Sequence, residues 1–221
     1  MQIIGITGGI GSGKSTIARA LAARGYAVYD CDREAKRIIA ENPAVQQQII
    51  ALFGEEAFVD GVYNTAYISK CVFSPPPGGA GGGLQALNAI IHPAVKEDIL
   101  QRSGLTATRS YSNAVLQAKP VFFIESAILY EAGLDELCDR IIIVDAPEEV
   151  RIERTIARDY NGDATPENIN KVRARIRAQQ SIIPPLSGSD ASPLSNPTLV
   201  TNDGSVSISD LADTILNWLQ K

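Results

Sequence analysis

Near the N-terminus the chain reads Gly8-Gly9-Ile10-Gly11-Ser12-Gly13-Lys14-Ser15. It matches G-x-x-x-x-G-K-[ST] at every fixed position, and it joins an apolar run, residues 2–7, to a run of helix formers, residues 14–23. A strand, a glycine-rich turn and a helix in this order bring backbone N–H groups and the positive end of the helix dipole to one point. The sequence therefore predicts a phosphate loop that binds ATP or GTP.

Each residue of this loop has an expected role. We expect the nucleotide to be bound by Gly9, Ile10, Gly11, Ser12, Gly13, Lys14, Ser15 and Thr16. Lys14 would reach the β- and γ-phosphates, and the Ser15 hydroxyl would hold Mg²⁺. Glu125, which ends an apolar run over residues 121–125, could contact Mg²⁺ through water or cap the following turn. ATP and Mg²⁺ are thus the expected cofactors.

The motifs of a GTP-binding switch are not matched. A guanine-reading motif would be Asn-Lys-x-Asp, but Asn170-Lys171-Val172-Arg173 lacks the aspartate and lies in a basic, helix-like stretch. Asp159-Tyr160-Asn161-Gly162 matches Asp-x-x-Gly, but it follows an expected helix instead of a strand. These observations favour a kinase over a switch protein.

The rest of the chain alternates between strand-like and helix-like segments. Short apolar runs predict strands over residues 2–7, 26–29, 121–125, 140–145 and 198–201. Helical spacing predicts helices over residues 14–23, 33–40, 43–53, 65–73, 84–100 (interrupted at His92-Pro93), 148–160, 166–180 and 209–219. Strands that alternate with helices imply an α/β fold with a parallel sheet covered on both faces. Residues 74–83, 103–113 and 182–196 are expected to be irregular, the first and last because they are rich in Pro, Gly or Ser.

Length and composition limit the alternatives. The 221 residues are 45% apolar and 20% charged, which suits one domain, residues 1–221, with room for a small inserted region. A net charge of −5 disfavours a general nucleic-acid binder. The chain has no apolar run of 18 residues and its first residues lack a charged leader pattern, so we expect neither a membrane span nor a signal peptide. Three widely spaced cysteines suggest reduced thiols in a cytoplasmic protein.

A carboxylate for proton transfer is expected in Asp30-Cys31-Asp32, at the end of the second strand. In open α/β sheets the carboxyl ends of the strands face the ligand. An aspartate there could take a proton from a substrate hydroxyl, while its neighbour could orient a water on Mg²⁺. Either aspartate could equally cap the helix expected from Arg33. The residues alone do not separate these readings.

Arginines are the expected source of positive charge around a transferring phosphoryl group. Arg151, Arg154 and Arg158 fall on one face of an expected helix that leads into a polar turn, as in a lid over ATP. For Arg151 we favour a solvated position paired with nearby glutamates. The basic run over residues 171–177 alternates at a spacing of two, which is more typical of a solvated helix. The single histidine, His92, is more often structural than catalytic in such a position.

Taken together, these motifs resemble the dephospho-coenzyme A (dephospho-CoA) kinase family. The specific matches are Thr7-Gly8-Gly9-Ile10-Gly11-Ser12-Gly13-Lys14, Asp30-Cys31-Asp32 and Leu87-Asn88-Ala89-Ile90-Ile91-His92-Pro93. Weaker matches continue as far as Asn202-Asp203-Gly204, so the resemblance covers most of the chain.

The resemblance implies a three-layer P-loop fold with a helical substrate-binding region at about residues 33–116 and a lid at about residues 154–180. It implies transfer of a phosphoryl group from ATP to the ribose 3′-hydroxyl of dephospho-CoA, the final step of coenzyme A synthesis. By resemblance, the catalytic residues are Asp32 (the base), Lys14, Arg154 and Arg158; Lys36 and His92 bind substrate with Asp32; and Asn202 lies near the adenine. The expected partner is this small molecule, with no nucleic acid or membrane, and the enzyme is expected to be a monomer or a weak homo-oligomer.

Four departures from the family pattern keep other readings open. Cys31 replaces a common alanine, Lys36 and Thr65 stand where the family usually has arginine, and residues 182–196 are rich in proline. Because two positive charges differ, a P-loop kinase for another small acceptor, such as a nucleoside monophosphate, is the alternative. A nucleotide-dependent binding protein with a degenerate acceptor site is a further alternative, against which Asp32, Arg154 and Arg158 argue.

Overall fold

The computed structural model describes residues 1–73, 83–104, 121–179 and 197–220. The chain forms two compact units: Met1–Asp30 with Tyr111–Lys221, and Cys31–Ser110. The segments expected to be irregular, residues 74–83, 103–113 and 182–196, lie wholly or mostly outside the described residues, as do the end of the expected substrate region and the last residue of the expected lid.

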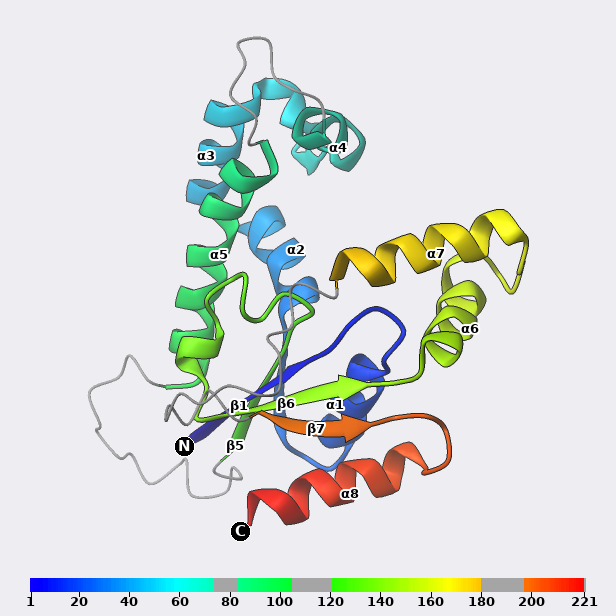
Figure 1. Cartoon of the computed structure of the whole chain (residues 1–221). Coiled ribbons are helices and arrows are strands. Elements are labelled where there is room, and N and C mark those ends of the chain that lie inside the picture. The colour runs from blue at the N-terminus through cyan, green and yellow to red at the C-terminus, as the bar shows by residue number, and fades with distance from the viewer. Residues whose placement is uncertain (74–82, 105–120, 180–196, 221) are drawn as a thin grey trace, which may run out of the picture. The chain divides into compact units, whose positions relative to one another are not determined.

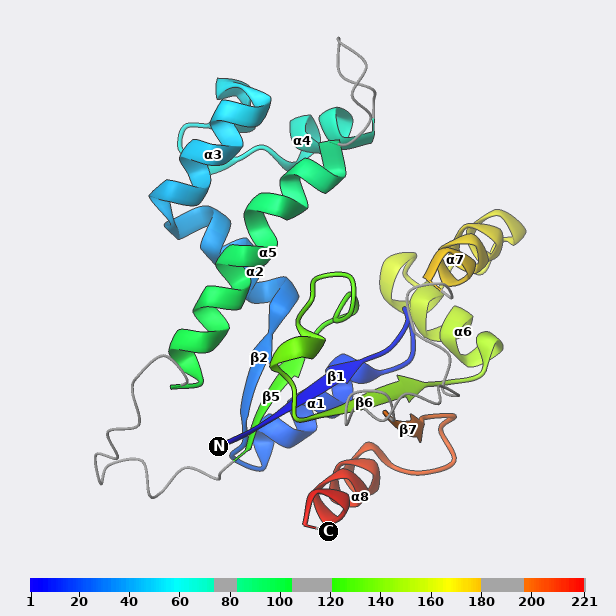
Figure 2. The same ribbon diagram turned by 60° about the vertical axis from the view of Figure 1, so that its left-hand side comes forward.

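The described part of the first unit contains a five-stranded sheet of order β2-β5-β1-β6-β7 (Figure 1 and Figure 2). Its strands, all parallel to their neighbours, are β1 (Gln2–Thr7), β2 (Ala27–Asp30), β5 (Val121–Glu125), β6 (Arg140–Asp145) and β7 (Thr198–Thr201). Four consecutive residues of β6, from Ile141 to Val144, are buried, which explains why the central strands read as continuous apolar runs. The expected parallel α/β sheet is confirmed.

Different parts of the chain cover the two faces of this sheet. On one face α1 (Lys14–Ala23) and α8 (Ile208–Leu219) pack together against Ile4 and Ile6 of β1 (Figure 2). The opposite face at Gly5 meets the segment that contains the short 3₁₀ helix η3 (Asp135–Leu137). A Cβ on Gly5 would come within 2.8 Å of the Leu129 side chain, so the glycine lets this segment pack closely on the strand.

A helical hairpin follows β6 in the first unit. It consists of α6 (Glu148–Asp159) and α7 (Pro166–Gln179), joined by a turn in which Asn161 and Gly162 both have positive φ. Glu148 and Glu149 lie in the first turn of α6, where carboxylates complement the helix dipole. The two helices bury an apolar cluster whose members are Ile152, Ile156, Val172 and Ile176, with Ile10 of the phosphate loop.

The second unit is mainly helical. Its elements are α2 (Cys31–Glu41), α3 (Pro43–Phe53), the 3₁₀ helix η1 (Glu55–Ala57), β3 (Phe58–Val59), β4 (Val62–Tyr63), α4 (Thr65–Phe73) and α5 (Gly83–Arg102). Asn42 caps α3 by accepting hydrogen bonds from the N–H groups of Ala44 and Val45.

Strands β3 and β4, of two residues each, form an antiparallel hairpin that was not predicted from the sequence. The hairpin turns at Asp60-Gly61, and both of these residues have positive φ.

Two sequence expectations need correction. The helix expected from Arg33 begins at Cys31, so Asp32 lies in the first helical turn and not in a loop after the strand. The break expected at His92-Pro93 is wrong, because α5 continues through Pro93. Proline removes a single hydrogen bond, to the carbonyl of Ala89, and burial of Leu87, Val95 and Ile99 against neighbouring helices holds both halves of α5 in place.

Among the described residues, no helix has the length and apolarity needed to cross a membrane.

Replacing Pro93 by alanine should raise the free energy of unfolding by about 1–3 kcal/mol, because it restores an N–H donor inside an exposed turn of α5. Urea unfolding followed by circular dichroism measures the change. Pro43→Ala is the matched control, since Pro43 is the first residue of α3 and its missing N–H has no helical acceptor there. Equal effects of the two substitutions would contradict this account of α5.

Candidate active site

Glycines of the phosphate loop sit where other parts of the first unit press against its backbone. Gly11 and Gly13 have φ of 76° and 93°, values that favour glycine. A side chain at Gly9 would collide with the guanidinium of Arg151, and one at Gly13 would collide with the amide of Asn202. The glycines of the motif therefore have two roles. They permit the backbone conformation of the loop, and they let α6 and the segment after β7 approach the loop closely.

The start of α1 carries the chemical groups of the loop. Lys14 Nζ lies 3.7 Å from Glu125 Oε1, and the Ser15 hydroxyl donates a hydrogen bond of 3.1 Å to the same oxygen. Glu125 is nearly buried at the end of β5, and its register partner in β2 is Asp30. The sequence suggested that Glu125 either contacts Mg²⁺ through water or caps the following turn. The structure places its carboxylate against both Lys14 and Ser15.

These groups fit a nucleotide with a divalent cation. The N–H groups of Lys14 and Ser15 precede the first helical hydrogen bonds of α1, which Thr16 and Ile17 donate to the Gly13 carbonyl, and such a helix N-terminus favours phosphate oxygens. Ser12 Oγ is buried and has no hydrogen-bond partner among the described residues, so a polar group is in place at the loop. Hydroxyl and carboxylate oxygens, as in Ser15 and Glu125, are the ligands that Mg²⁺ prefers. Within the described residues no cluster of three or more His, Cys, Asp or Glu side chains could hold a metal alone.

Asn202 and Arg154 hold the loop from the other side. The Asn202 side-chain amide donates to the Ser12 carbonyl at 2.9 Å, and its backbone N–H donates to the Asp145 carbonyl at 2.7 Å. Arg154 donates to the Asn202 backbone oxygen at 2.9 Å and more weakly to the Ser12 carbonyl at 3.4 Å. Both predicted site residues thus lie at the phosphate loop, with the Asn202 side chain pointed at backbone. The expected contact between Asn202 and adenine stays a prediction.

The solvated position favoured for Arg151 is wrong. Arg151 is only 9% exposed; its Nε donates to the Ile10 carbonyl at 2.9 Å, and its guanidinium lies 3.7 Å from Asp145. Burial lowers the pKa of Arg151, while the charges of Asp145 and Glu148 raise it. The spacing that put Arg151 and Arg154 on one face was a correct signal, but the sequence could not show that this face meets the phosphate loop.

Arg158 occupies a different environment at the end of α6. Its guanidinium donates to Asp159 at 2.6 Å, and Arg175 of α7 donates to the same carboxylate at 2.8 Å. The hydrogen bond from Arg158 is the largest cause that lowers the pKa of Asp159 to about 2. The side chain of Arg158 is mostly exposed. Lys171, Arg173 and Arg175 each pair with a carboxylate at the surface, as the interpretation of α7 as a solvated helix requires.

The residues predicted to bind the acceptor lie in the second unit. Asp32 and Lys36 are four residues apart in α2, both exposed, and therefore project from the same helix face. His92 is half-buried within α5, and Thr65 begins α4. Their expected roles stay predictions.

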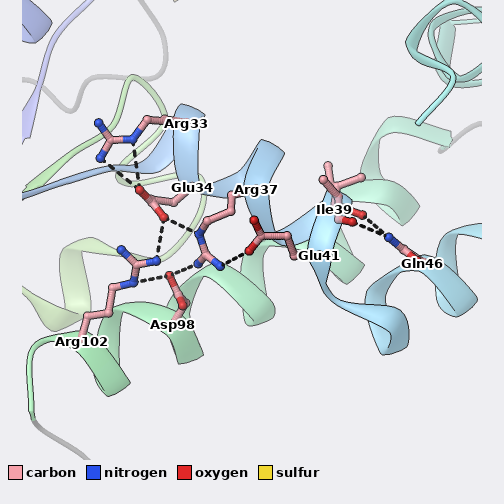
Figure 3. Close-up of polar contacts among 9 residues, drawn as sticks. Arg33, Glu34, Arg37, Ile39, Glu41, Gln46, Asp98 and Arg102 are labelled. Atoms are coloured by element: carbon pink, nitrogen blue, oxygen red, sulfur yellow. Dashed lines mark hydrogen bonds and ion pairs between the residues drawn. The ribbon is translucent and has the colours of Figure 1, made fainter. Parts of the chain in front are cut away.

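A buried carboxylate that was not singled out from the sequence belongs to Glu34, two residues after Asp32 in α2. Glu34 of α2 is 4% exposed and accepts from Arg37 at 2.7 Å, from Arg33 at 3.0–3.1 Å and from Arg102 of α5 at 2.9 Å (Figure 3). Asp98 bridges Arg37 and Arg102 at 2.8 and 3.1 Å. Burial raises the pKa of Glu34, but the hydrogen bonds from Arg37 and Arg33 and the charge of Arg102 lower it further, to below its ordinary value. This network ties the first turns of α2 to the end of α5.

Comparison with known proteins now identifies the family. The family model for dephospho-CoA kinase matches residues 2–191. The chain belongs to the dephospho-CoA kinase family. Relatives with this name include proteins from Porphyromonas gingivalis (41% identical, covering 75% of this chain and 74% of theirs) and Bacteroides fragilis (37%, covering 80% and 77%). A dephospho-CoA kinase from Carboxydothermus hydrogenoformans is 34% identical over all of this chain and 94% of its own.

Solved structures agree on the fold of this dephospho-CoA kinase family member. A Thermus thermophilus protein matches with a TM-score of 0.67 and 29% identity, over 99% of this chain and 96% of its own. Dephospho-CoA kinase from Campylobacter jejuni matches at 0.62 and 19% identity (99% and 98% covered), and shikimate kinase from Acinetobacter baumannii at 0.52 and 18% (100% and 93%). The latter two show the fold alone. The P-loop kinase fold and the family resemblance are both confirmed, and nothing in these comparisons supports another acceptor.

Glu34→Gln should lower the free energy of unfolding by about 2–3 kcal/mol at neutral pH, because it leaves three arginines without their shared buried carboxylate. The pKa of Glu34 is lower in the folded state than in the unfolded state, so its stabilisation is complete above the unfolded pKa of about 4. It is lost as the pH falls through the folded pKa. Urea titrations over a pH series measure the difference between wild type and variant.

Glu97→Gln, at an exposed position of α5, is the control for that experiment and should change stability by less than about 0.5 kcal/mol. A difference between wild type and Glu34→Gln that stayed constant into strong acid would show that Glu34 does not act through its charge.

Proposed function

We propose that the chain transfers the γ-phosphoryl group of ATP to the ribose 3′-hydroxyl of dephospho-CoA, with the residue roles set out below. This is the reaction of the dephospho-CoA kinase family and the final step of coenzyme A synthesis. The observation that carries the assignment is a complete phosphate loop, with Lys14 and Ser15 against Glu125, in a chain of this family. The nucleotide chemistry follows from the loop, whereas the choice of acceptor follows from the family.

The phosphate loop, residues 9–16, would bind ATP through backbone N–H groups and through Lys14; the Ile10 N–H, which donates to Gln179 Oε1, is not one of these donors. The N-terminal end of α1 favours anions, and Lys14 adds a full charge that reaches the β- and γ-phosphates. Ser15 would hold Mg²⁺, with Glu125 orienting the Ser15 hydroxyl through the bond of 3.1 Å. Bound Mg²⁺ supplies neutralisation of phosphate charge.

Asp32 would act as the general base for the acceptor hydroxyl. It is exposed in the first turn of α2, two residues after β2 ends, so its carboxylate is open to a ligand. Lys36, one turn further along the same face, would contribute positive charge toward the acceptor's phosphates. His92 of α5 would complete the substrate-binding side of the helical unit, within the region proposed at residues 33–116.

Arg154 and Arg158 would stabilise the charge that develops on the transferring phosphoryl group. Arg154 has the stronger structural support, because its guanidinium already lies at the backbone of Ser12 and Asn202. Arg158 is held by Asp159 at the end of α6 and would act from the lid proposed at residues 154–180.

We also propose a cytoplasmic location. Cys31, Cys71 and Cys138 all lie in described segments and are thiols, not disulfides. Reducing compartments maintain such thiols.

Asp32→Asn should lower kcat by about 10²- to 10⁴-fold, because the amide cannot accept the hydroxyl proton. The affinity for ATP, measured by titration calorimetry, should change little, since Asp32 is not part of the phosphate loop. Turnover is followed as coenzyme A formed per enzyme.

Asp213→Asn is the control for this change. Asp213 makes an exposed ion pair with Arg24, and the same Asp-to-Asn substitution there should leave kcat within about twofold. If Asp32→Asn kept wild-type turnover, Asp32 would not be the base. If the wild type bound ATP and transferred no phosphoryl group, the chain would be a binding protein instead of a kinase.

A further inference from the structure

Ile10, a residue of the phosphate loop, is held at three points by the α6–α7 hairpin. Its N–H donates to Oε1 of Gln179, the last residue of α7, at 2.7 Å. Its carbonyl accepts from Arg151 of α6 at 2.9 Å. Ile10 as a whole is 8% exposed, and its side chain belongs to the apolar cluster between the two helices.

Each of these contacts carries a cost when it is broken. A buried N–H or C=O without a partner is penalised more than an ordinary hydrogen bond is worth. Removing the Ile10 side chain from the cluster would expose apolar surface on both helices, because Ile152 and Ile156 come from α6 and Val172 and Ile176 from α7. The loop and the hairpin therefore favour one mutual arrangement.

The neighbours of Ile10 strengthen the connection. A Cβ on Gly9 would collide with the Arg151 guanidinium, and one on Gly11 would collide with the Arg151 backbone. The loop is thus in van der Waals contact with α6 on both sides of Ile10. A small displacement of the hairpin cannot leave this part of the backbone unchanged, because packed groups have no empty space to absorb it.

We propose that Ile10 couples the phosphate loop to the α6–α7 hairpin, and that Gln179 is a positioning residue that acts on bound nucleotide through the Ile10 amide. This proposal rests on the proposed function, since it assigns Gln179 to ATP binding by the same loop. The Gln179 side chain need not touch ATP. It holds the entry to the loop, so that the following N–H groups stay in the conformation that phosphate requires.

Thermodynamic linkage makes this coupling reciprocal. If the bond between Gln179 and Ile10 favours ATP binding, then bound ATP must strengthen the attachment of α7 by the same free energy. Nucleotide should therefore slow amide hydrogen exchange along α7, although α7 itself contributes no predicted phosphate ligand.

The test uses the full-length enzyme and the variant Gln179→Met, which keeps the length of the side chain and removes its carbonyl oxygen. We expect the KM for ATP to rise about tenfold, with the KM for dephospho-CoA within about twofold of wild type. A non-hydrolysable ATP analogue should slow hydrogen exchange in α7 of the wild type and have little effect there in the variant. Ile10→Val, which trims the apolar anchor and keeps both backbone bonds, should shift the KM for ATP in the same direction by a smaller factor.

Gln220→Met provides the matched control, because Gln220 is an exposed residue just after α8 and the substitution is the same. Unchanged KM for ATP in Gln179→Met, or an equal rise in both KM values, would overturn the coupling. A wild type with no turnover would defeat the proposed function instead. The exchange measurement, which needs only analogue binding, would still decide the role of Gln179 in that case.

Discussion

Arg151 and Asn202 approach the glycines of the phosphate loop closely, and these contacts position the loop within the first unit. A Cβ at Gly9 would collide with the Arg151 guanidinium and one at Gly13 with the Asn202 amide, so a side chain there would have to displace these groups from the loop. The glycines thus serve two purposes: they leave backbone N–H groups open to phosphate on one side, and they admit the elements that hold the loop on the other. These contacts oppose the conformational freedom that four glycines among the eight residues 8–15 would otherwise give the loop.

Buried carboxylates organise both units through cations. In the first unit Glu125 lies against Lys14 and Ser15, so the groups expected to meet phosphate and Mg²⁺ share one acceptor. In the second unit Glu34 gathers arginines from α2 and α5 and stabilises the helical turn that carries Asp32. Each carboxylate is satisfied by several donors, as a buried charge must be. The proposed base and the phosphate loop are therefore each supported by an electrostatic network within their own unit.

The sequence predicted those features that depend on local patterns. Apolar runs, caps and glycines predicted the sheet strands, α1, α3, α4 and the α6–α7 hairpin. The loop motif predicted nucleotide binding. Contacts between segments that are distant in the sequence could not be predicted from local patterns. Gln179 and Ile10 are 169 positions apart, and the buried state of Arg151 depends on which surface α6 meets. The break predicted at Pro93 was wrong because it rested on local helix propensity, whereas packing of the residues before and after Pro93 keeps α5 continuous. The β3–β4 hairpin had a local signal in Asp60-Gly61, but its strands are too short to show a period.

Product identification with the wild-type enzyme, Mg·ATP and dephospho-CoA decides whether the chain phosphorylates this acceptor. Mass spectrometry should show an acceptor that gains one phosphoryl group, and phosphorus–proton correlation NMR should place that group on the ribose 3′-oxygen. We expect this product to form only when both substrates are present. Binding of ATP without transfer of its phosphoryl group, or a phosphoryl group at a different position or on a different acceptor, would contradict the proposed reaction.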